Sequence, residues 1–412
     1  MNKYLLIVFL ALLNTHALRA QQTAIYHQPD VLYNKGYELF INQKYSAARE
    51  VFDEYLQQPE GTAANVINAQ YYTGVSGFEL FHPDAESKLL TFTRQYPENT
   101  HAARASFYLG KLYYRQKRYR NALPFFEKTD VYYLTNDEVP EFYFKSGYCY
   151  YMKSDLEKAS KNFKEIIGVE SRYQTAAQYY YAHIAYANNN YNTAMELFKK
   201  LSASETFGSI VPYYITQIYF EQSKYTELVA YADPLLQTEG IQNETEIRRL
   251  IAESYYRKAD YKNARTQFDI YSKAVSTMSR NDLYSLGYSE YRDKDYKPAI
   301  EHLQKVVDIN DSLAQNAYYH LADCFIKTNN KQSARNAFQA ASKMDFNAEI
   351  KETSLFNYGK LSAELNFQPV AINAFRDFLK QYPQSKNADE ANELVARLYL
   401  TTRNYKDAFA AV

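Results

Sequence analysis

The chain has 412 residues, of which 46% are hydrophobic and 23% are charged, with 11 glycines and 11 prolines. This composition excludes a disordered or low-complexity chain and allows a large buried core. Lys and Arg number 47, as do Asp and Glu, and neither sign forms a long run, which argues against a nucleic-acid or anionic-membrane partner. The 44 tyrosines, 24 phenylalanines and absence of tryptophan favour many half-buried amphipathic positions.

Residues 1–20 have the features of an export signal. Lys3 stands in a short basic start, an apolar run covers residues 4–13, and a polar segment ends at Ala20. The run is about half of the ~20 residues that a membrane-spanning helix needs, so a cleaved signal peptide is favoured over a retained anchor. We therefore expect an exported chain without a transmembrane span, located in a bacterial periplasm, with attachment to the outer membrane or secretion as alternatives.

From residue 30 onward the sequence repeats. One position, called here the reference residue, recurs at intervals of 34 to 37 residues. Three residues after it stands alanine in ten of eleven repeats. The pattern predicts about eleven repeats in residues 21–412, the last one incomplete. The reference residues are Tyr45, His82, Tyr119, Leu156, Tyr191, Tyr225, Tyr261, Tyr296, Lys331, Gln368 and Tyr405.

A small residue stands nine positions before most reference residues. The series is Gly36, Thr73, Gly110, Gly147, Ala182, Thr216, Ala252, Gly287, Ala322, Gly359 and Ala396. A glycine inside a helix costs roughly 1 kcal/mol against alanine, so we expect it where two helices approach closely. In the third repeat, Gly110 is predicted to contact Ala122 of the second helix. Phe126, seven residues after the reference residue, is predicted to cover this contact.

Each repeat holds two helical patterns of about thirteen residues, with aromatic, small and bulky residues in a fixed order. This pattern resembles the tetratricopeptide repeat (TPR). Segments such as "FTRQYPENTHAARASFYLGKLYYRQKRYRNA" further resemble the bacterial envelope branch of the family, which includes the Tol-Pal-associated periplasmic coordinator. The resemblance implies an all-α fold, an α-solenoid of about eleven TPR helix-turn-helix units in a right-handed superhelix. The family's tryptophan is absent from this chain.

The resemblance also implies that the first helices line a concave, partner-binding surface. Positions twelve, eight and five before the reference residue share one face of the first helix. Because tyrosine offers a large rigid contact area and a hydroxyl, we hypothesise an aromatic groove for an extended peptide or a helix. The candidate residues are Phe107, Lys111, Tyr114, Arg115, Phe144, Tyr148, Tyr151, Tyr179, His183, Tyr186, Tyr213, Gln217, Tyr284 and Tyr288.

The aromatic residues have two alternative roles. The aromatic residues can serve only to pack neighbouring first helices, which is the commoner use of such a stripe. Tyrosine faces also stack on sugars, so the rival ligand class is carbohydrate or cell-wall glycan. The sequence predicts neither the identity of a partner nor an oligomeric state.

No motif for catalysis is present. The sequence has no HExxH, no Gly-rich phosphate loop and no GxSxG, and its seven histidines are scattered. His183 is expected to be a satisfied or solvent-facing side chain, because no second metal ligand lies one turn away. We predict a non-catalytic scaffold that needs no cofactor or metal and binds protein or peptide partners of the cell envelope.

Two further expectations concern the cysteines and the end of the chain. Cys149 and Cys324 lie five repeats apart, too far for a disulfide, and are expected to be buried as small apolar side chains. No cysteine follows the signal to carry a lipid. The last repeat stops at Val412, seven residues after Tyr405, so we expect the natural chain to continue or a partner to cover this end.

Overall fold

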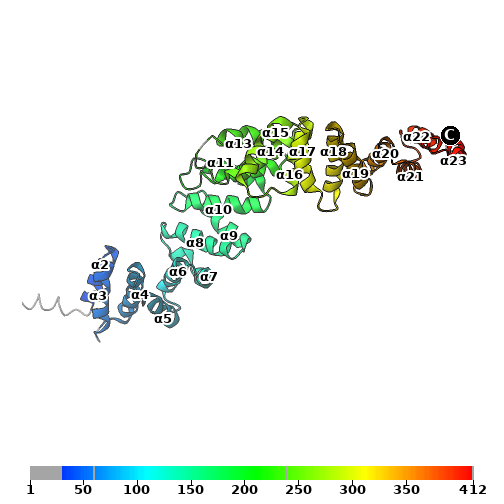
Figure 1. The fold of residues 1–412 in the computed structure, drawn as a ribbon. Coiled ribbons are helices and arrows are strands. Elements are labelled where there is room, and N and C mark those ends of the chain that lie inside the picture. The colour runs from blue at the N-terminus through cyan, green and yellow to red at the C-terminus, as the bar shows by residue number, and fades with distance from the viewer. Residues whose placement is uncertain (1–29, 59–60, 238, 411–412) are drawn as a thin grey trace, which may run out of the picture. The chain divides into compact units, whose positions relative to one another are not determined.

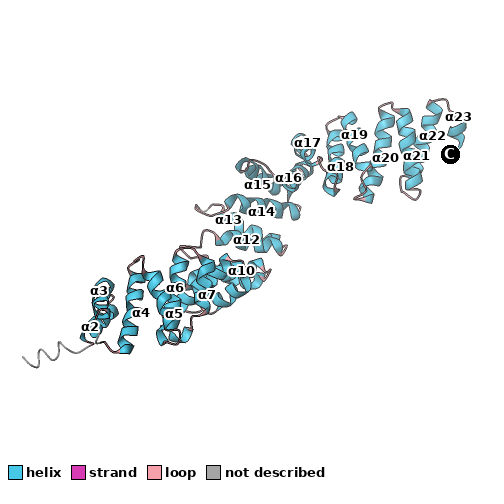
Figure 2. Ribbon diagram, turned by 90° about the horizontal axis from the view of Figure 1, so that it is seen from below, coloured by secondary structure: helices cyan, strands magenta, loops and turns pink. Residues whose placement is uncertain are grey.

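The computed structural model describes residues 30–58, 61–237 and 239–410. It divides into two compact units: the N-terminal unit runs to Leu197, and the C-terminal unit starts at Phe198. The described residues form helices joined by turns and contain no strand (Figure 1, Figure 2). The predicted signal, residues 1–20, lies outside the described residues.

Eleven successive helix pairs make up the described chain, with even-numbered first helices and odd-numbered second helices. The N-terminal unit contains α2 (Val31–Ile41), α3 (Tyr45–Leu56), α4 (Ala63–Glu79), α5 (Ala85–Gln95), α6 (Thr100–Arg115), α7 (Tyr119–Glu127), the short 3₁₀ helix η1 (Val131–Tyr133), α8 (Glu138–Met152), α9 (Leu156–Lys164) and α10 (Gln174–Ala187). The division between the units falls inside α11 (Tyr191–Leu201).

The C-terminal unit continues the same alternation of first and second helices. It contains α12 (Val211–Glu221), α13 (Tyr225–Leu235), α14 (Glu244–Arg257), α15 (Tyr261–Ala274), α16 (Arg280–Arg292), α17 (Tyr296–Leu303), the 3₁₀ helix η2 (Gln304–Val306), α18 (Ser312–Lys327), α19 (Lys331–Ser342), α20 (Ala348–Glu364), α21 (Gln368–Gln381), α22 (Ala388–Thr401) and α23 (Tyr405–Ala410). Within each unit a helix packs mainly on the helix before it and the helix after it. The fold is a solenoid of helical repeats.

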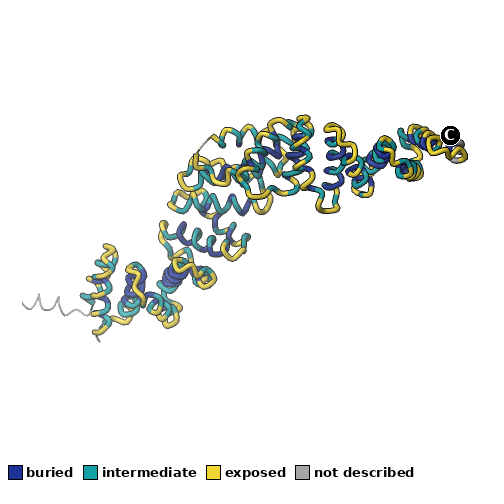
Figure 3. The backbone as a smooth tube through the Cα atoms, in the orientation of Figure 1, coloured by how far each residue is buried: buried dark blue, intermediate teal, exposed yellow. Residues whose placement is uncertain are grey.

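The core of each unit lies along the facing sides of successive helices. Figure 3 shows this as buried stretches that recur along the tube, with exposed residues concentrated at the turns. The alanine three residues after the reference residue is fully buried in most repeats, and Phe52, Phe126 and Phe375 from the second helices are buried to 1% exposure or less. The repeated alanine and phenylalanine thus encode the contact between the two helices of a pair.

The side chain nearest to Gly110 is Phe126, which was predicted to cover the contact between the two helices. A Cβ atom on Gly110 would lie 2.7 Å from Cδ1 and Cε1 of Phe126, so the glycine faces the phenylalanine ring. Gly36 and Gly359 face Phe52 and Phe375 of their own repeats in the same way. The glycine therefore makes room for a buried ring, which explains why a helix keeps a residue of low helix propensity.

The second repeat departs from the predicted register. Ten second helices begin at the reference residue, but α5 begins at Ala85, after Pro83 and three residues past His82. Residues 80–84 separate α4 from α5, a longer turn than residues 42–44 between α2 and α3, and the left-handed residue Phe81 directly precedes the reference residue His82. Gly74 rather than Thr73 consequently takes the small position, since its Cβ would lie 2.9 Å from Leu89 Cδ2.

A left-handed residue ends every first helix, and none of these residues is glycine. In the first repeat Gln43 has φ 58°. The N–H of Lys44 donates to the carbonyl of Leu39, and the N–H of Gln43 donates to that of Phe40, each at 2.9 Å. This is a Schellman cap, which satisfies carbonyls at the helix end. Glycine usually marks such caps, and here only Asn189, Asn329 and Asn366 have the other residue type that is typical of them.

Replacing Ala259 by glycine is expected to raise the free energy of unfolding by about 1 kcal/mol. Ala259 is exposed and left-handed, with φ 58°, and a Cβ atom there costs about 1 kcal/mol or more. The matched control is Ala187→Gly at the exposed end of α10, where glycine lowers helix propensity and stability. Urea unfolding followed by circular dichroism measures both, and a loss of stability in Ala259→Gly would contradict the cap.

Both cysteines are expected to resist thiol reagents in the folded chain. Cys149 and Cys324 are free and fully buried, as predicted, and burial raises the pKa of each thiol to about 12. Since the thiolate is the reactive form, modification at neutral pH should need unfolding. Mass spectrometry after maleimide treatment with and without denaturant tests this, and rapid labelling of the native chain would show that these helices open readily.

Candidate functional site

The candidate surface, called here the first-helix face, consists of the positions twelve, eight, five and four before each reference residue. In the N-terminal unit these positions bring side chains of α6, α8 and α10 together. In the C-terminal unit they lie on α12, α14, α16 and α18. The two units carry separate clusters, which are described in turn.

Phe107 does not belong to the exposed surface. Its side chain is fully buried, with its ring centroid 6.4 Å from Phe126 and 6.3 Å from Phe142. The ammonium of Lys111 lies 5.0 Å from the centre of the Phe107 ring and covers it. We therefore remove Phe107 from the candidate residues, because a ring enclosed on all sides by its own chain offers no area to a partner.

Lys111 takes part in a partly buried charge cluster. Its Nζ lies 3.0 Å from Oε2 of Glu141, and Lys145 Nζ lies 2.5 Å from Oε1 of the same carboxylate. Burial alone would raise the pKa of Glu141, but the two lysines outweigh it and hold the pKa below its usual range. Burial also lowers the pKa of Lys145. Both lysines thus serve mainly to compensate a carboxylate that is 6% exposed.

Arg115 is exposed and lies over two rings at the edge of the face. Its guanidinium carbon is 4.1 Å from the centre of the Phe81 ring and 4.5 Å from that of Phe78. Phe81 is 72% exposed, so the arginine covers a ring that is otherwise open to water. The pair is a cation–π contact on accessible surface, which suits recognition as well as packing.

Tyr148 is the centre of the N-terminal ring cluster, defined here as Tyr114, Phe144, Tyr148, Tyr151 and Tyr180. The ring centroid of Tyr148 lies 5.3 Å from that of Tyr180, 5.7 Å from Tyr114, 6.2 Å from Phe144 and 6.4 Å from Tyr151. All five side chains are half-buried. Burial raises the pKa of Tyr114 and of Tyr180, so both phenols remain protonated donors. The sequence analysis missed Tyr180, because it lies one residue beyond the expected position.

His183 joins this cluster through Tyr151. The distance from Tyr151 Oη to His183 Nδ1 is 3.2 Å, and burial lowers the pKa of the imidazole, which is therefore neutral at pH values near 7. Tyr179 lies on the same helix with its ring centroid 6.4 Å from that of His183. Tyr186, near the end of α10, packs its ring 6.1 Å from Tyr191 instead. Of the predicted candidates on α10, His183 contacts Tyr151 of the N-terminal ring cluster, and Tyr186 contacts Tyr191 at the start of α11.

The candidates of the C-terminal unit fall into two places. In α12, Gln217 Nε2 donates to Tyr213 Oη at 3.3 Å. In α16, the ring centroid of Tyr288 lies 6.0 Å from that of Tyr284 and 4.8 Å from that of His320 on α18. Tyr256, Tyr261 and Tyr291 also pack on Tyr288, which makes it the counterpart of Tyr148.

A cavity of about 450 Å³ opens on the first-helix face of the C-terminal unit. Tyr284 is the one predicted candidate that lines it. Its other walls combine rings with charged and hydroxyl groups: Phe220, Arg249, Glu253, Tyr256, Arg257, Ser279, Asn281, Asp282, Ser285 and Leu313. The charged members were not predicted; Arg257 pairs with Glu253 within α14, and Arg249 lies 3.5 Å from Asp282 of the next repeat.

The carboxylates of this cavity are already paired. Glu253 is 7% exposed, accepts from Arg257 Nε at 2.7 Å and accepts from Ser285 Oγ at 2.9 Å. Asp282 is 4% exposed and is held by Ser279 Oγ at 2.7 Å, with Arg249 Nη1 at 3.5 Å. Burial raises the pKa of Tyr256, beside Glu253, to about 12. The cavity wall therefore offers hydroxyl groups, aromatic rings and arginine side chains, and both of its carboxylates accept from groups of the chain itself.

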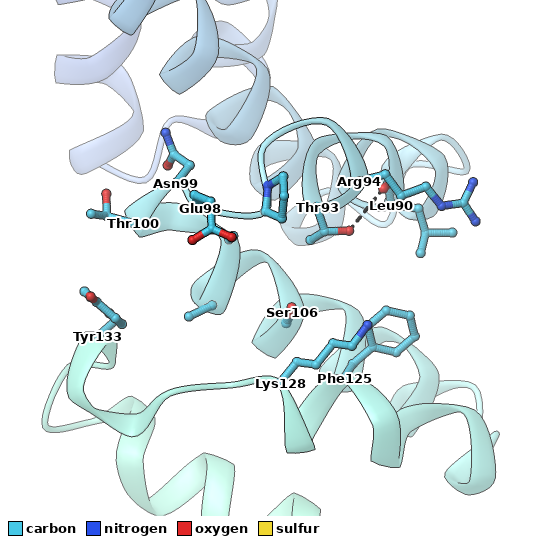
Figure 4. A pocket seen from close by; sticks show the side chains of 13 residues that line it. Leu90, Thr93, Arg94, Glu98, Asn99, Thr100, Ser106, Phe125, Lys128 and Tyr133 are labelled. Atoms are coloured by element: carbon cyan, nitrogen blue, oxygen red, sulfur yellow. Dashed lines mark hydrogen bonds between the residues drawn. The ribbon is translucent and has the colours of Figure 1, made fainter.

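A second cavity lies away from the first-helix face. It has a volume of about 680 Å³ and is formed by α5, the start of α6, α7 and η1. Figure 4 shows Glu98 and Ser106 directed toward its interior, with Lys128 and Tyr133 at its rim. Smaller cavities occupy the corresponding place between α3 and α5 and between α19 and α21. The recurrence identifies these outer cavities as a consequence of repeat packing.

Metal and membrane sites were sought along the described ranges. Among residues 30–58, 61–237 and 239–410, no three His, Cys, Asp or Glu side chains are placed to hold a metal ion. Within the same part of the chain, every helix is too short or too polar to cross a lipid bilayer.

Comparison with known proteins yields two family matches. Residues 81–130 match the tetratricopeptide-repeat family, and residues 269–341 match the family described as anaphase-promoting complex, cyclosome, subunit 3. No curated protein matches.

Several solved structures are similar. The TPR protein YrrB, whose structure is described as having an unusual peptide-binding site, is 18% identical with a TM-score of 0.41, covering 48% of this chain and all of its own. A TPR protein from Parabacteroides merdae is 14% identical with a TM-score of 0.38, covering 64% of this chain and 99% of its own. MamA from Desulfovibrio magneticus is 19% identical with a TM-score of 0.34, covering 43% and 96%.

The segment matched by the repeat family contains the helix pair α6 and α7, with buried Gly110, Ala122 and Phe126. Residues 81–130 thus match the tetratricopeptide-repeat family, and the rest of the described chain continues as a solenoid of helix pairs.

Proposed function

We propose that this chain is a non-catalytic scaffold of the bacterial cell envelope, which is exported and binds protein or peptide partners on its first-helix face. The TPR fold itself indicates a scaffold for protein–protein interaction. The apolar run of residues 4–13 supports export and a periplasmic location. The Tyr-Pro endings of repeats support a relationship with the Tol-Pal-associated branch.

The observation that carries the proposal is the N-terminal ring cluster. Its five rings come from three consecutive first helices and are half-buried, and four of them are tyrosines that carry a hydroxyl group. A patch of rigid rings with phenolic donors is suited to bind an extended peptide, because it offers contact area at low entropic cost. Arg115 adds a cation at the edge of this patch.

A pull-down from native envelopes tests the proposal. The bait is the chain without its first twenty residues, and the variant changes Tyr148 and Tyr179 to alanine. We expect specific envelope proteins to be retained by the unmodified chain and lost from the variant. The matched control is Tyr132→Ala, an equal truncation at a tyrosine that is 86% exposed and lies in η1, off the face.

Both variants must first show the helicity of the unmodified chain, since Tyr148 also packs on its neighbours. Retention of the same proteins by the Tyr148 and Tyr179 variant would contradict a peptide surface here and leave packing as the role of these rings. If the bait binds envelope glycan and retains no protein, carbohydrate binding rather than protein binding is the function of this surface.

A further inference from the structure

Large apolar side chains are exposed at the turns that follow the first helices of the N-terminal unit. Phe81 is 72% exposed and Ile41 is 59% exposed, and Leu80 and Met152 are exposed as well. These residues lie at the ends of α2, α4 and α8. Because α2 contacts α4, α4 contacts α6 and α6 contacts α8, the four turns follow one another along one edge of the unit. This edge, called here the turn patch, comprises residues 41–44, 80–82, 115–118 and 152–153.

Packing within the repeats does not require these apolar side chains. The corresponding turns of the sixth to ninth repeats contain no Ile, Leu, Met or Phe; they are residues 221–224, 257–260, 292–295 and 327–330. Phe81 also adopts a left-handed backbone, with φ 57°, which disfavours a bulky side chain. A phenylalanine that is both left-handed and open to water contributes little to folding, so we expect it to contact something outside the chain.

Cations surround the apolar side chains of the turn patch. The exposed cations are Lys44, Arg115, Lys117, Arg118 and Lys153. In the part of the chain that the structure describes, none of them lies within 4.0 Å of a carboxylate. Positive and negative charges cancel over the whole chain, so composition alone does not reveal this local excess.

The carboxylates nearest to the patch in the sequence are engaged or half-buried. Asp84 accepts from Arg49 at 2.6 Å, and Asp155 accepts from the backbone N–H of Lys158 at 3.1 Å. Glu79 is half-buried, and burial raises its pKa. The charge that the turn patch presents to solvent is therefore positive.

We propose that the turn patch binds the surface of an anionic lipid bilayer, with Phe81, Leu80 and Ile41 entering the boundary between headgroups and acyl chains. Interfacial binding combines apolar side chains that enter this boundary with cations that meet the lipid phosphates. Because turns project from the end of a helix pair, a flat bilayer can contact several of them at once. A second copy of this chain fits the patch less well, since it would bring like charges together.

This inference goes beyond the proposed function, because its ligand is lipid and its residues lie where the first helices end. The test uses the chain from residue 21, since the apolar run of residues 4–13 would itself bind lipid. All described residues remain, because they start at residue 30. The probes are vesicles of equal parts phosphatidylglycerol and phosphatidylcholine, with vesicles of phosphatidylcholine alone as the control for charge.

Insertion is followed by the fluorescence of a single indole. The chain contains no tryptophan, so Phe81→Trp places the only indole in the turn patch. The matched control is Phe346→Trp, at a phenylalanine of the C-terminal unit that is 52% exposed. We expect anionic vesicles to shift the emission of Phe81→Trp to shorter wavelength and to leave that of Phe346→Trp unchanged.

Affinity is measured by sedimentation with the vesicles. Ile41→Gln with Phe81→Asn should weaken binding about tenfold, since it removes two inserting side chains while asparagine tolerates the left-handed turn. The matched control, Ile309→Gln with Phe346→Asn, removes the same residue types from positions that are 51% and 52% exposed and should bind as the unmodified chain does. All variants must first show the helicity of the unmodified chain, which we expect because each replaced side chain is exposed.

The contribution of charge has its own pair of variants. Lys44→Gln with Lys117→Gln should weaken binding to the anionic vesicles at low salt and have less effect at high salt. The matched control is Lys262→Gln with Lys297→Gln, which removes the same charge from exposed positions of α15 and α17. Vesicles of phosphatidylcholine alone should bind more weakly than the anionic vesicles.

The inference is overturned if anionic vesicles do not bind the chain, if the indole of Phe81→Trp keeps its emission when they bind, or if a patch variant and its control lose the same affinity. An emission shift that depends on protein concentration without vesicles would identify a second copy as the occupant and would overturn it too. None of these results bears on the retention of envelope proteins by Tyr148 and Tyr179. Failure of the lipid site and failure of the proposed function are thus distinguishable.

Discussion

The variant Glu141→Ala is expected to lower the free energy of unfolding by about 3 kcal/mol, because it leaves two partly buried lysines without their counter-charge. The side chain of Glu141 is 8% exposed, and those of Lys111 and Lys145 are 11% and 17% exposed. Removing the shared carboxylate leaves two ammonium groups in a region of low dielectric without the carboxylate that contacts both of them. Urea unfolding followed by circular dichroism measures the change.

The matched control is Glu157→Ala in α9. Glu157 also lies in the first turn of its helix and pairs with a lysine one turn later, Lys161, at 2.7 Å. Its side chain is 80% exposed and that of Lys161 is 72% exposed, so we expect no measurable loss of stability. Equal effects of the two substitutions would show that burial of Glu141 does not govern its contribution.

The effect of Glu141 should also depend on pH. Its pKa is lower in the folded chain than in the unfolded chain, so its stabilising contribution is complete above the ordinary carboxyl pKa of about 4.3. It is lost as the pH falls through the lowered pKa of the folded state. The stability difference between Glu141→Ala and the unmodified chain should therefore shrink in acid and stay constant near neutrality.

Gly110→Ala is expected to cost up to about 2 kcal/mol, although alanine is the better helix former. The new Cβ would lie 2.7 Å from two carbons of the Phe126 ring, which is 1% exposed. Overpacking of this kind costs about 1 to 3 kcal/mol, from which the gain in helix propensity of about 1 kcal/mol is subtracted. Thermal and urea unfolding of the variant measure the difference.

Gly168 supplies the control for this substitution. A Cβ there would meet nothing within 4 Å, so Gly168→Ala should cost no stability. Trimming the ring with Phe126→Leu in the Gly110→Ala background should recover part of the loss, because the two sites are in contact and their effects are not additive. A fully additive double variant would contradict the account of the close approach.

The repeat architecture could be predicted from the sequence because packing imposes it in every repeat. Alanine three positions after the reference residue, in ten of eleven repeats, and phenylalanine seven positions after it, in seven of them, are buried, and ten second helices begin at the reference residue. The prediction for the second repeat was wrong because α5 begins only at Ala85, after Pro83, and the small position is occupied by Gly74 rather than Thr73.

The candidate site was less predictable, because equal positions in different repeats have different surroundings. Phe107 and Phe144 occupy the same repeat position, yet Phe107 is enclosed by Phe126, Phe142 and Lys111, whereas Phe144 is half-buried. The left-handed residues after the first helices were not predicted, because none of them is glycine. The burial of a first-helix side chain depends on its neighbours in the adjacent repeat. A comparison of equal repeat positions does not include those neighbours.

The central claim, that partners bind on the first-helix face, is tested most directly by photo-cross-linking in living cells. A benzoylphenylalanine in place of Tyr179 on α10 is expected to form a discrete adduct with an envelope protein. The same probe in place of Glu157, which is 80% exposed on the second helix α9, should form none. Adducts from position 157 with none from position 179 would contradict the account and move the binding surface to the second helices.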